Sequence, residues 1–161
     1  MGIFEFAMQK EKYSEDFYRD LAARSNNKGL QTIFTLLAEE EVKHFKIIEQ
    51  MKKEEPKENV ETTLLTDAKD IFEKMRKGVE KFDFDVNQID IYKKAQDIEE
   101  QSEKFYLEKS DEIKEEYQKQ IFLKLAQEEK KHYFLLDNII EFVSRPELWL
   151  ENAEFCHLEE Y

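Results

Sequence analysis

Two copies of a Glu-x-x-His motif carry side chains that bind metal ions, Glu41 with His44 and Glu129 with His132. Residues three apart are neighbours on a helix surface, so each motif presents a carboxylate and an imidazole together. Each motif interrupts a helical stripe that is otherwise apolar, which predicts that it faces a core. One such motif would arise often by chance in a chain with 39% charged residues. Two copies on core stripes predict a metal site.

Two further glutamates complete the candidate ligand set, and they interrupt apolar stripes in the segments that precede the two motifs. One shift of 88 positions superimposes the first half of this set on the second: Glu11, Glu41 and His44 correspond to Glu99, Glu129 and His132. The same shift aligns the surrounding segments without a gap, as expected for an internal repeat. Two copies of a helical hairpin make a four-helix bundle with approximate twofold symmetry.

The elements that must position these residues follow from the periodicity. We expect one domain, residues 1–161, with a first helical hairpin at 3–53, a crossover at 54–88 that contains a short helix near 71–79, a second hairpin at 89–143 and an apolar tail at 144–161. The hairpin turns are expected at residues 26–29 and 110–114. Three glycines and two prolines in 161 residues suit long helices and few turns. The predicted fold class is an all-α, ferritin-like four-helix bundle with a long crossover between its second and third helices.

The register of each hairpin brings the candidate ligands to one level. Glu11 and the Glu41/His44 motif lie about equally far from their turn, roughly 22–25 Å at the helical rise per residue. Four carboxylates in an apolar core cannot all stay ionised without compensation. Two divalent cations would cancel the four negative charges. Carboxylate-rich sites with one imidazole per ion suit iron or manganese, and residue types alone leave zinc open.

Composition excludes several classes of partner. The net charge of −13 makes nucleic acid and anionic membrane surfaces poor partners. No apolar stretch approaches the roughly 20 residues of a membrane span. Cys156 is the only cysteine, which fits a reducing compartment. We therefore expect a cytoplasmic protein, and the apolar tail and the crossover predict a homodimer, with exchange of helix pairs as one possible arrangement.

Four segments carry a resemblance to a known family: AMQKEKYSEDFY and LAEEEVKHF, then AQDIEEQSEKFY and LAQEEKKHY. They resemble the rubrerythrin branch of the ferritin-like superfamily, whose di-iron pattern is a Glu from each of two helices and a Glu-x-x-His motif from each of two others. The resemblance implies two iron ions, with Glu11 and Glu99 as terminal ligands, Glu41 and Glu129 as bridges and one histidine on each ion. It also implies chemistry with oxygen or peroxide.

Two departures from rubrerythrins bear on function. Those proteins usually carry a rubredoxin domain with paired Cys-x-x-Cys motifs, so the single cysteine here implies an external electron donor such as a rubredoxin-like protein. They also tend to place a glutamate at the position of Ser102, and its replacement counts against a redox-linked ligand exchange. Ser14 and Ser102 are expected to make room beside the ligands.

Other polar residues near the motifs have more than one interpretation. Tyr18 and Tyr106 follow their glutamates by seven residues, and each is either a core tyrosine with a satisfied hydroxyl or a hydrogen-bond donor to a bridging carboxylate. Glu40 and Glu128 also repeat, but they lie on a more polar stripe and are expected to flank the metal ligands. His157, in the tail, has no repeat partner and is expected at the surface.

Three functions remain open from the sequence. The first is a non-haem di-iron oxidoreductase that removes hydrogen peroxide or oxygen, and multiple turnover would distinguish it. The second is an iron-handling protein that oxidises or holds iron without turnover. The third is an interaction bundle stabilised by its metal, whose centre would be inert to peroxide and air. A cage-forming ferritin is less expected, because the sequence of the tail differs from that of a fifth bundle helix.

Overall fold

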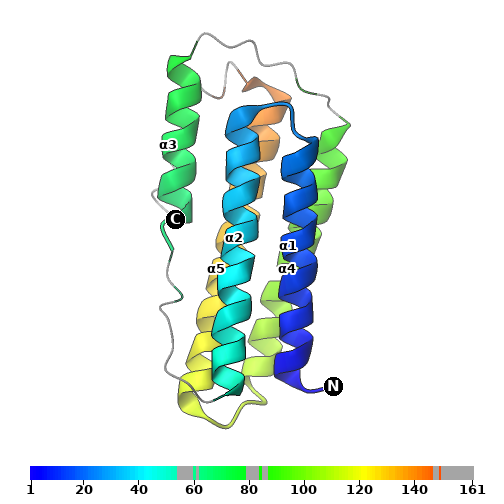
Figure 1. The fold of residues 1–161 in the computed structure, drawn as a ribbon, viewed down its shortest axis with the longest axis vertical. Coiled ribbons are helices and arrows are strands. Elements are labelled where there is room, and N and C mark those ends of the chain that lie inside the picture. The colour runs from blue at the N-terminus through cyan, green and yellow to red at the C-terminus, as the bar shows by residue number, and fades with distance from the viewer. Residues whose placement is uncertain (54–59, 61, 79–83, 85–86, 147–148, 150–161) are drawn as a thin grey trace.

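The computed structural model describes residues 1–53, 60, 62–78, 84, 87–146 and 149. Within these ranges the chain forms five helices and no strand (Figure 1). The helices are α1 (Ile3–Arg24), α2 (Lys28–Lys52), α3 (Leu64–Lys77), α4 (Gln88–Ser110) and α5 (Glu116–Ser144). The predicted all-α, ferritin-like helical bundle is confirmed. None of the described helices is both long and apolar enough to cross a membrane.

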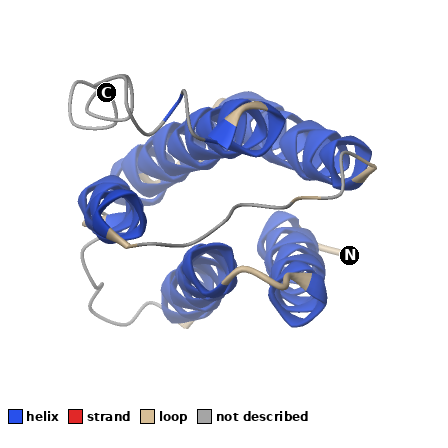
Figure 2. Cartoon of the chain, turned by 90° about the horizontal axis from the view of Figure 1, so that it is seen from above, coloured by secondary structure: helices blue, strands red, loops and turns tan. Residues whose placement is uncertain are grey.

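The bundle consists of two antiparallel hairpins, α1 with α2 and α4 with α5. Seen from above, the hairpins form two layers, and α3 stands at one edge of them (Figure 2). Helix α3 packs on α2, and its Phe72 ring lies 5.3 Å from the ring of Phe142 in α5, measured between centroids. The crossover helix therefore covers the open edge between the two hairpins.

The helix boundaries differ from the predicted ones where side chains or turns define the ends. Asn27 caps α2 by accepting a 2.9 Å hydrogen bond from the Leu30 amide, so the first turn is shorter than 26–29 and Gly29 is already helical. Helix α5 begins at Glu116, beyond the predicted turn at 110–114, because the Ile113 amide still bonds the Ser110 carbonyl in that turn at 3.3 Å. Helix α3 begins at Leu64, well before the predicted 71.

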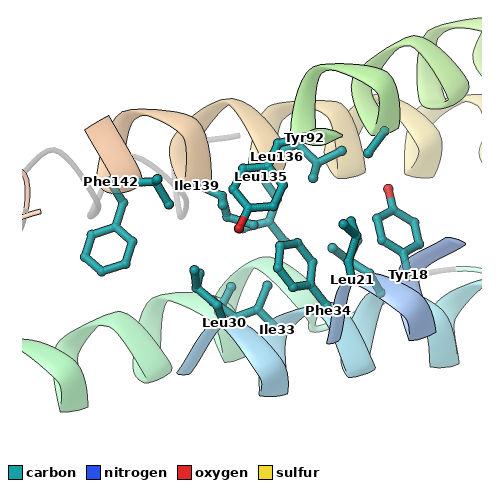
Figure 3. Packing of buried hydrophobic residues seen from close by; sticks show 14 of the residues in the cluster. Tyr18, Leu21, Leu30, Ile33, Phe34, Tyr92, Leu135, Leu136, Ile139 and Phe142 are labelled. Carbon is teal, nitrogen blue, oxygen red and sulfur yellow. The ribbon is translucent and has the colours of Figure 1, made fainter. Parts of the chain in front are cut away.

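A layer of polar side chains divides the apolar core into two clusters. The first cluster contains Tyr18, Leu21, Phe34, Tyr92 and Leu136, among others (Figure 3). The second cluster is built around Ala7, Ile47, Tyr106, Phe122 and Leu125. Burial of these side chains provides most of the stabilisation of helices whose outer faces are charged. The apolar layers above and below also shield the polar layer from water.

One residue of the tail shows where that segment begins to pack. Trp149 is 2% exposed, and its ring centroid lies 4.7 Å from that of Phe72 and 5.7 Å from that of Phe142. Trp149 of the apolar tail therefore packs on helices of its own chain. The other apolar residues of the tail, Leu148, Leu150, Phe155 and Leu158, lie outside the described residues, as do Cys156 and His157.

Candidate metal centre

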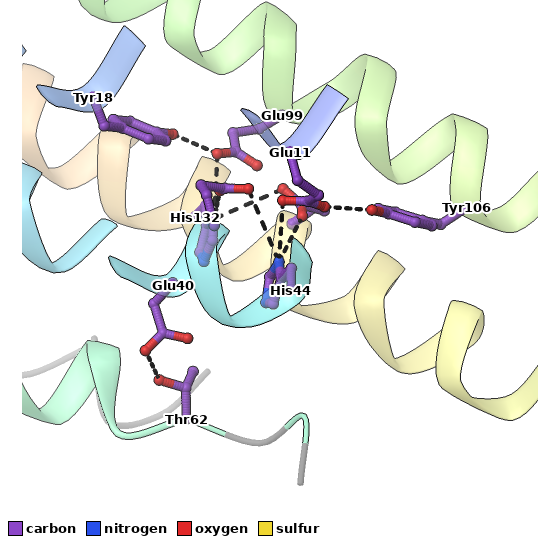
Figure 4. Close-up of polar contacts among 10 residues, drawn as sticks. Glu11, Tyr18, Glu40, His44, Thr62, Glu99, Tyr106 and His132 are labelled. Carbon is purple, nitrogen blue, oxygen red and sulfur yellow. Dashed lines mark hydrogen bonds and ion pairs between the residues drawn. The ribbon is translucent and has the colours of Figure 1, made fainter. Parts of the chain in front are cut away.

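Each bundle helix contributes to one buried polar cluster at mid-bundle. Helices α1 and α4 each supply one glutamate, and α2 and α5 each supply a glutamate and a histidine (Figure 4). All six side chains are at most 2% exposed: Glu11, Glu41, His44, Glu99, Glu129 and His132. These are the six residues predicted from the sequence, and the fold brings them together as the hairpin register requires.

The cluster divides into two groups that overlap. One group is Glu11, Glu41, His44 and Glu129, and the other is Glu41, Glu99, Glu129 and His132. Within each group, one potential ligand atom per residue lies within 4.8 Å of all the others. Glu41 and Glu129 belong to both groups, so each lies near the potential ligand atoms of both.

The two histidines make equivalent contacts across an approximate twofold axis. His44 Nδ1 lies 3.1 Å from Glu129 Oε1 and 3.6 Å from Glu11 Oε2. His132 Nδ1 lies 2.9 Å from Glu41 Oε1 and 3.2 Å from Glu99 Oε1. The two imidazole rings are parallel within 2°, with their centroids 5.6 Å apart. Both Nδ1 atoms therefore face the carboxylates. Each lies near one glutamate of the first hairpin and one glutamate of the second.

Several atoms of the cluster are buried without a hydrogen-bond partner. Among the described residues, both oxygens of Glu41 and the Oε2 atoms of Glu11, Glu99 and Glu129 make no hydrogen bond. Buried polar groups in folded proteins are nearly always satisfied, and exceptions require a reason such as a bound ion. Five unsatisfied carboxylate oxygens in one place fit a site for cations, whose ligands they would be.

The carboxylates shift one another's pKa strongly. Burial, followed by the charges of the neighbouring carboxylates, raises the pKa of Glu41 and of Glu129 well above the usual value. Burial also raises the pKa of Glu99, to about 7. Without a cation, the folded cluster therefore retains protons that carboxylates in water would have lost. A divalent cation would replace those protons.

Two groups of the cluster are held in their charged forms. Burial opposes the charge of Glu11, but hydrogen bonds from its neighbours and the charge of His44 outweigh burial and lower its pKa to about 2. Burial likewise opposes the charge of His44, but Glu11 and Glu129 outweigh it and raise its pKa to about 9. In the absence of metal, this pair forms an ion pair within the cluster.

The two predicted tyrosines bond glutamates of the other hairpin. Tyr18 in α1 donates to Glu99 Oε1 in α4, and Tyr106 in α4 donates to Glu11 Oε1 in α1 (Figure 4). The hydrogen-bond interpretation is thus confirmed, but the acceptors are the glutamates assigned as terminal ligands and not the bridging ones. The reason is geometric. Each tyrosine lies seven residues, about two helical turns, after the glutamate of its own helix, and at that level its hydroxyl is beside the glutamate of the facing helix. These bonds tie α1 to α4.

Replacing Tyr106 by phenylalanine should remove one of these ties. A hydrogen bond to a charged acceptor contributes about 1–3 kcal/mol, so we expect the free energy of unfolding to fall by about that amount. Tyr92→Phe is the matched control, because Tyr92 is as buried as Tyr106 but its hydroxyl donates only to Gln88, at 3.3 Å. Urea denaturation of both variants measures the difference, and equal losses would contradict a special role for the Tyr106–Glu11 bond.

The repeated glutamates Glu40 and Glu128 stay outside the cluster, as expected. Glu40 accepts a 2.6 Å hydrogen bond from Thr62 of the crossover. Glu128 is only 2% exposed, and its Oε2 lies 3.5 Å from Lys131 Nζ. The burial of Glu128 was not evident from its polar stripe, because that burial depends on the neighbouring helices. Ser14 and Ser102 are also buried, and both line a groove between α1 and α4.

Comparisons with known proteins agree with this geometry. A family model described as Rubrerythrin matches residues 3–140. This range includes α1, α2 and α4, all of α5 except its last four residues, and all six clustered residues. A comparison with curated proteins finds no significant match. Among solved structures, a hypothetical protein from Pyrococcus furiosus is similar, with a TM-score of 0.67 and 25% identity over 90% of each chain. The fold, the clustered residues and the family match together show that this chain belongs to the rubrerythrin family.

Proposed function

We propose that the six clustered residues bind two iron ions and that the protein is a non-haem oxidoreductase, which reduces hydrogen peroxide or oxygen with electrons from an external donor. The observation that carries this proposal is the pair of overlapping four-residue groups that share Glu41 and Glu129. Two-metal sites hold their ions roughly 3.5–4 Å apart, and carboxylates common to both groups are suited to that spacing.

The residues present fit two divalent ions in charge and in donor type. Four carboxylates would bring a charge of −4, which two such ions balance, and the histidines add neutral nitrogen donors. We assign Nδ1 as the donor atom of His44 and of His132, because these atoms face the carboxylates at 2.9–3.9 Å. Glu11 and Glu99 would each serve one ion, with the hydroxyls of Tyr106 and Tyr18 orienting them.

Bound as ferrous ions, the pair would supply the two electrons that reduction of peroxide to water requires. The protein contributes the spacing and the surroundings. The shared carboxylates keep the two sites adjacent, and the apolar clusters on either side limit the access of water. The chain has a single cysteine and thus no Cys-x-x-Cys pair of its own. Repeated turnover would therefore need a separate reductant, such as a rubredoxin-like protein.

Stopped-flow mixing tests this proposal. The full chain is loaded with two equivalents of ferrous iron without oxygen and then mixed with hydrogen peroxide. We expect near-ultraviolet absorption of carboxylate-bound ferric iron to develop fully at one peroxide per two irons, because each ferrous ion gives one electron. A chain that binds two irons and does not oxidise them with peroxide or oxygen would contradict the proposal.

Iron handling without turnover is a second candidate function, and Ser102 favours it. This serine is buried beside the cluster, where rubrerythrins tend to carry an additional glutamate, so this position supplies no carboxylate for a ligand exchange. Multiple-turnover assays with a rubredoxin-like donor separate the two functions. Sustained consumption of peroxide supports the oxidoreductase, and a single oxidation event followed by retention of iron supports iron handling.

We further propose that the protein is a homodimer that associates through the crossover and tail region. The supporting observation is that α3 and Trp149 extend the apolar core beyond the four bundle helices. Light scattering at micromolar concentration should give about twice the chain mass. A mass equal to one chain across this concentration range would contradict the proposed dimer.

A further inference from the structure

A groove of about 590 Å³ lies between α1 and α4 on the outside of the bundle. Its lining includes two serines, Ser14 from α1 and Ser102 from α4. Each serine lies one helical turn after a clustered glutamate, Glu11 or Glu99, and residues three apart are neighbours on a helix. The groove therefore reaches the layer of the candidate metal centre, from the edge of the bundle away from α3 (Figure 2).

The two serines are largely buried, and neither hydroxyl has a hydrogen-bond partner in the described part of the protein. Ser14 is 3% exposed and Ser102 is 4% exposed, and no hydrogen bond joins either hydroxyl to another described residue. Other serines at helix positions in this chain do bond the backbone, such as Ser110 to the Leu107 carbonyl at 2.7 Å. Two hydroxyls that line one groove and have no partner among the described residues can donate to or accept from a polar group of a ligand.

The walls of the groove are largely aromatic and apolar. Phe6, Tyr13, Phe17 and Ile98 contribute to them. Phe6 is 44% exposed and Tyr13 is 62% exposed, so both present apolar surface to the groove that a bound molecule would cover. Aromatic side chains bind flat ring systems well, because stacked and edge-to-face contacts add to the burial of area.

The charges at the groove are of the opposite sign to the protein as a whole. Lys10 and Lys94 line it together with one acidic residue, Asp97, in a chain whose net charge is −13. Lys10 Nζ lies 5.7 Å from the ring centroid of Phe6 and 5.6 Å from that of Phe105, which holds it at the aromatic wall. No ion pair joins either lysine to a carboxylate within the described ranges. Two ammonium groups against one carboxylate leave the groove with a net positive charge, which favours an anion.

We propose that this groove binds a small organic anion with a flat apolar body, of the class of aromatic carboxylates. Its carboxylate pairs with a lysine of the groove, its ring lies against an aromatic side chain of α1, and a hydroxyl on the ring bonds Ser14 or Ser102. The groove is within the volume range of ordinary small-molecule sites, 300–1,000 Å³ on average, and far larger than peroxide or oxygen needs. The site is thus distinct from the metal ligands and places an organic molecule beside them.

Fluorescence titration of the full chain as purified tests this inference with 6-hydroxy-2-naphthoate as the probe. We expect saturable binding of one probe per chain. The double variant Lys10→Gln/Lys94→Gln should weaken binding by about tenfold or more, since it removes both lysines that can make the charge-assisted contact. Lys124→Gln is the matched control: Lys124 is an exposed lysine of α5 that is not in the groove, and its loss should leave the affinity unchanged.

Two related probes separate the contributions of the groove. 2-Naphthol lacks the carboxylate and should bind at least about tenfold more weakly than 6-hydroxy-2-naphthoate. 2-Naphthoate lacks the hydroxyl, and Ser14→Ala/Ser102→Ala should weaken the hydroxylated probe several-fold while leaving 2-naphthoate unaffected. Thermal melting monitored by circular dichroism confirms that each variant is folded.

Several results would overturn the inference. These are an absence of saturable binding, equal affinity for 2-naphthol, and an affinity insensitive to the lysine and serine substitutions. A change of Tyr13→Glu that converts a dimer into a monomer would show instead that a second copy covers the groove. The titration needs no iron and no turnover, so its outcome is independent of the peroxide experiment, and either proposal can fail alone.

Discussion

Replacing Glu129 by alanine is expected to abolish the binding of two ions by the chain. Glu129 belongs to both four-residue groups, so its truncation removes a ligand from each ion at once. Loss of a partner that only orients a ligand typically costs 10–100-fold in metal affinity, and we expect a loss of at least about 100-fold for a shared ligand. His132 belongs to one group only, so His132→Ala should weaken mainly one ion.

Glu128→Ala is the matched control for this prediction. Glu128 is the adjacent residue, has the same side chain and is nearly as buried, at 2% against 1% for Glu129, but it belongs to neither group. Anaerobic titration with ferrous iron, followed by metal analysis after desalting, should give two ions for wild type and for Glu128→Ala. Loss of metal from Glu128→Ala with retention in Glu129→Ala would refute the assignment of ligands.

Removal of metal is expected to make the stability of the protein fall as pH rises. Glu41, Glu99 and Glu129 have folded-state pKa values above the usual value, chiefly because they are buried, and that of Glu99 is about 7. Each of these groups keeps its proton in the folded state at pH values where the unfolded chain has released it. The stabilisation is therefore complete below the unfolded pKa and is lost as pH rises through the folded pKa.

His44 acts in the same direction at higher pH. Its pKa is raised to about 9, so its contribution is lost between about pH 6.5 and 9. Glu11 acts in the opposite direction, but its pKa of about 2 places its effect below pH 4.5, outside this window. From Glu99 alone, the free energy of unfolding should fall by roughly 2 to 3 kcal/mol between pH 5 and 8.

Bound metal should remove this decline. Cations replace the protons of the cluster, so the stability of the loaded protein should stay level or rise over the same pH range. At free metal 100 times the dissociation constant, binding adds about 2.7 kcal/mol to the free energy of unfolding. Urea denaturation of chelated and loaded protein at several pH values measures both effects. A loaded protein no more stable than the chelated one, with metal loss confirmed, would contradict the proposed centre.

Repulsion among surface charges could also lower stability at high pH in so acidic a protein, and two controls separate it. Salt at about 0.5 M screens exposed charges within a few ångströms and leaves a buried cluster largely unaffected, so the decline should persist. Glu99→Gln removes one titrating group and should flatten the decline in the chelated protein. A decline that vanishes in salt and is unchanged in Glu99→Gln would assign it to the surface.

The sequence by itself determined the bundle and the six residues that meet in it. Helical periodicity is a local property, so the spacing of Glu41 and His44 already placed both on the core face of one helix. The internal repeat then required a second, equivalent hairpin with Glu129 and His132. Equal distances from each turn fixed the level at which the side chains of neighbouring helices meet, which is why Glu11 lies 3.6 Å from His44 in the structure.

Features that depend on the facing helix were decided only by the tertiary structure. The sequence placed Tyr18 and Tyr106 one layer from the glutamates of their own helices, but their acceptors, Glu99 and Glu11, lie across the bundle. Glu128 lies on a polar stripe and is nevertheless buried. These outcomes depend on contacts between residues more than 80 positions apart or on the covering of a helix by its neighbours, and local spacing contains no information on either.

The groove between α1 and α4 is the clearest feature that only the tertiary structure determined. From the sequence, Ser14 and Ser102 were small residues expected to make room beside the ligands. The packing of the two hairpins leaves that room open to the outside, with aromatic side chains from α1, Ile98 from α4 and two lysines 84 positions apart, Lys10 and Lys94, in the lining. A helix sequence specifies which residues share its face, but the separation of two helices depends on the side chains of every layer between them.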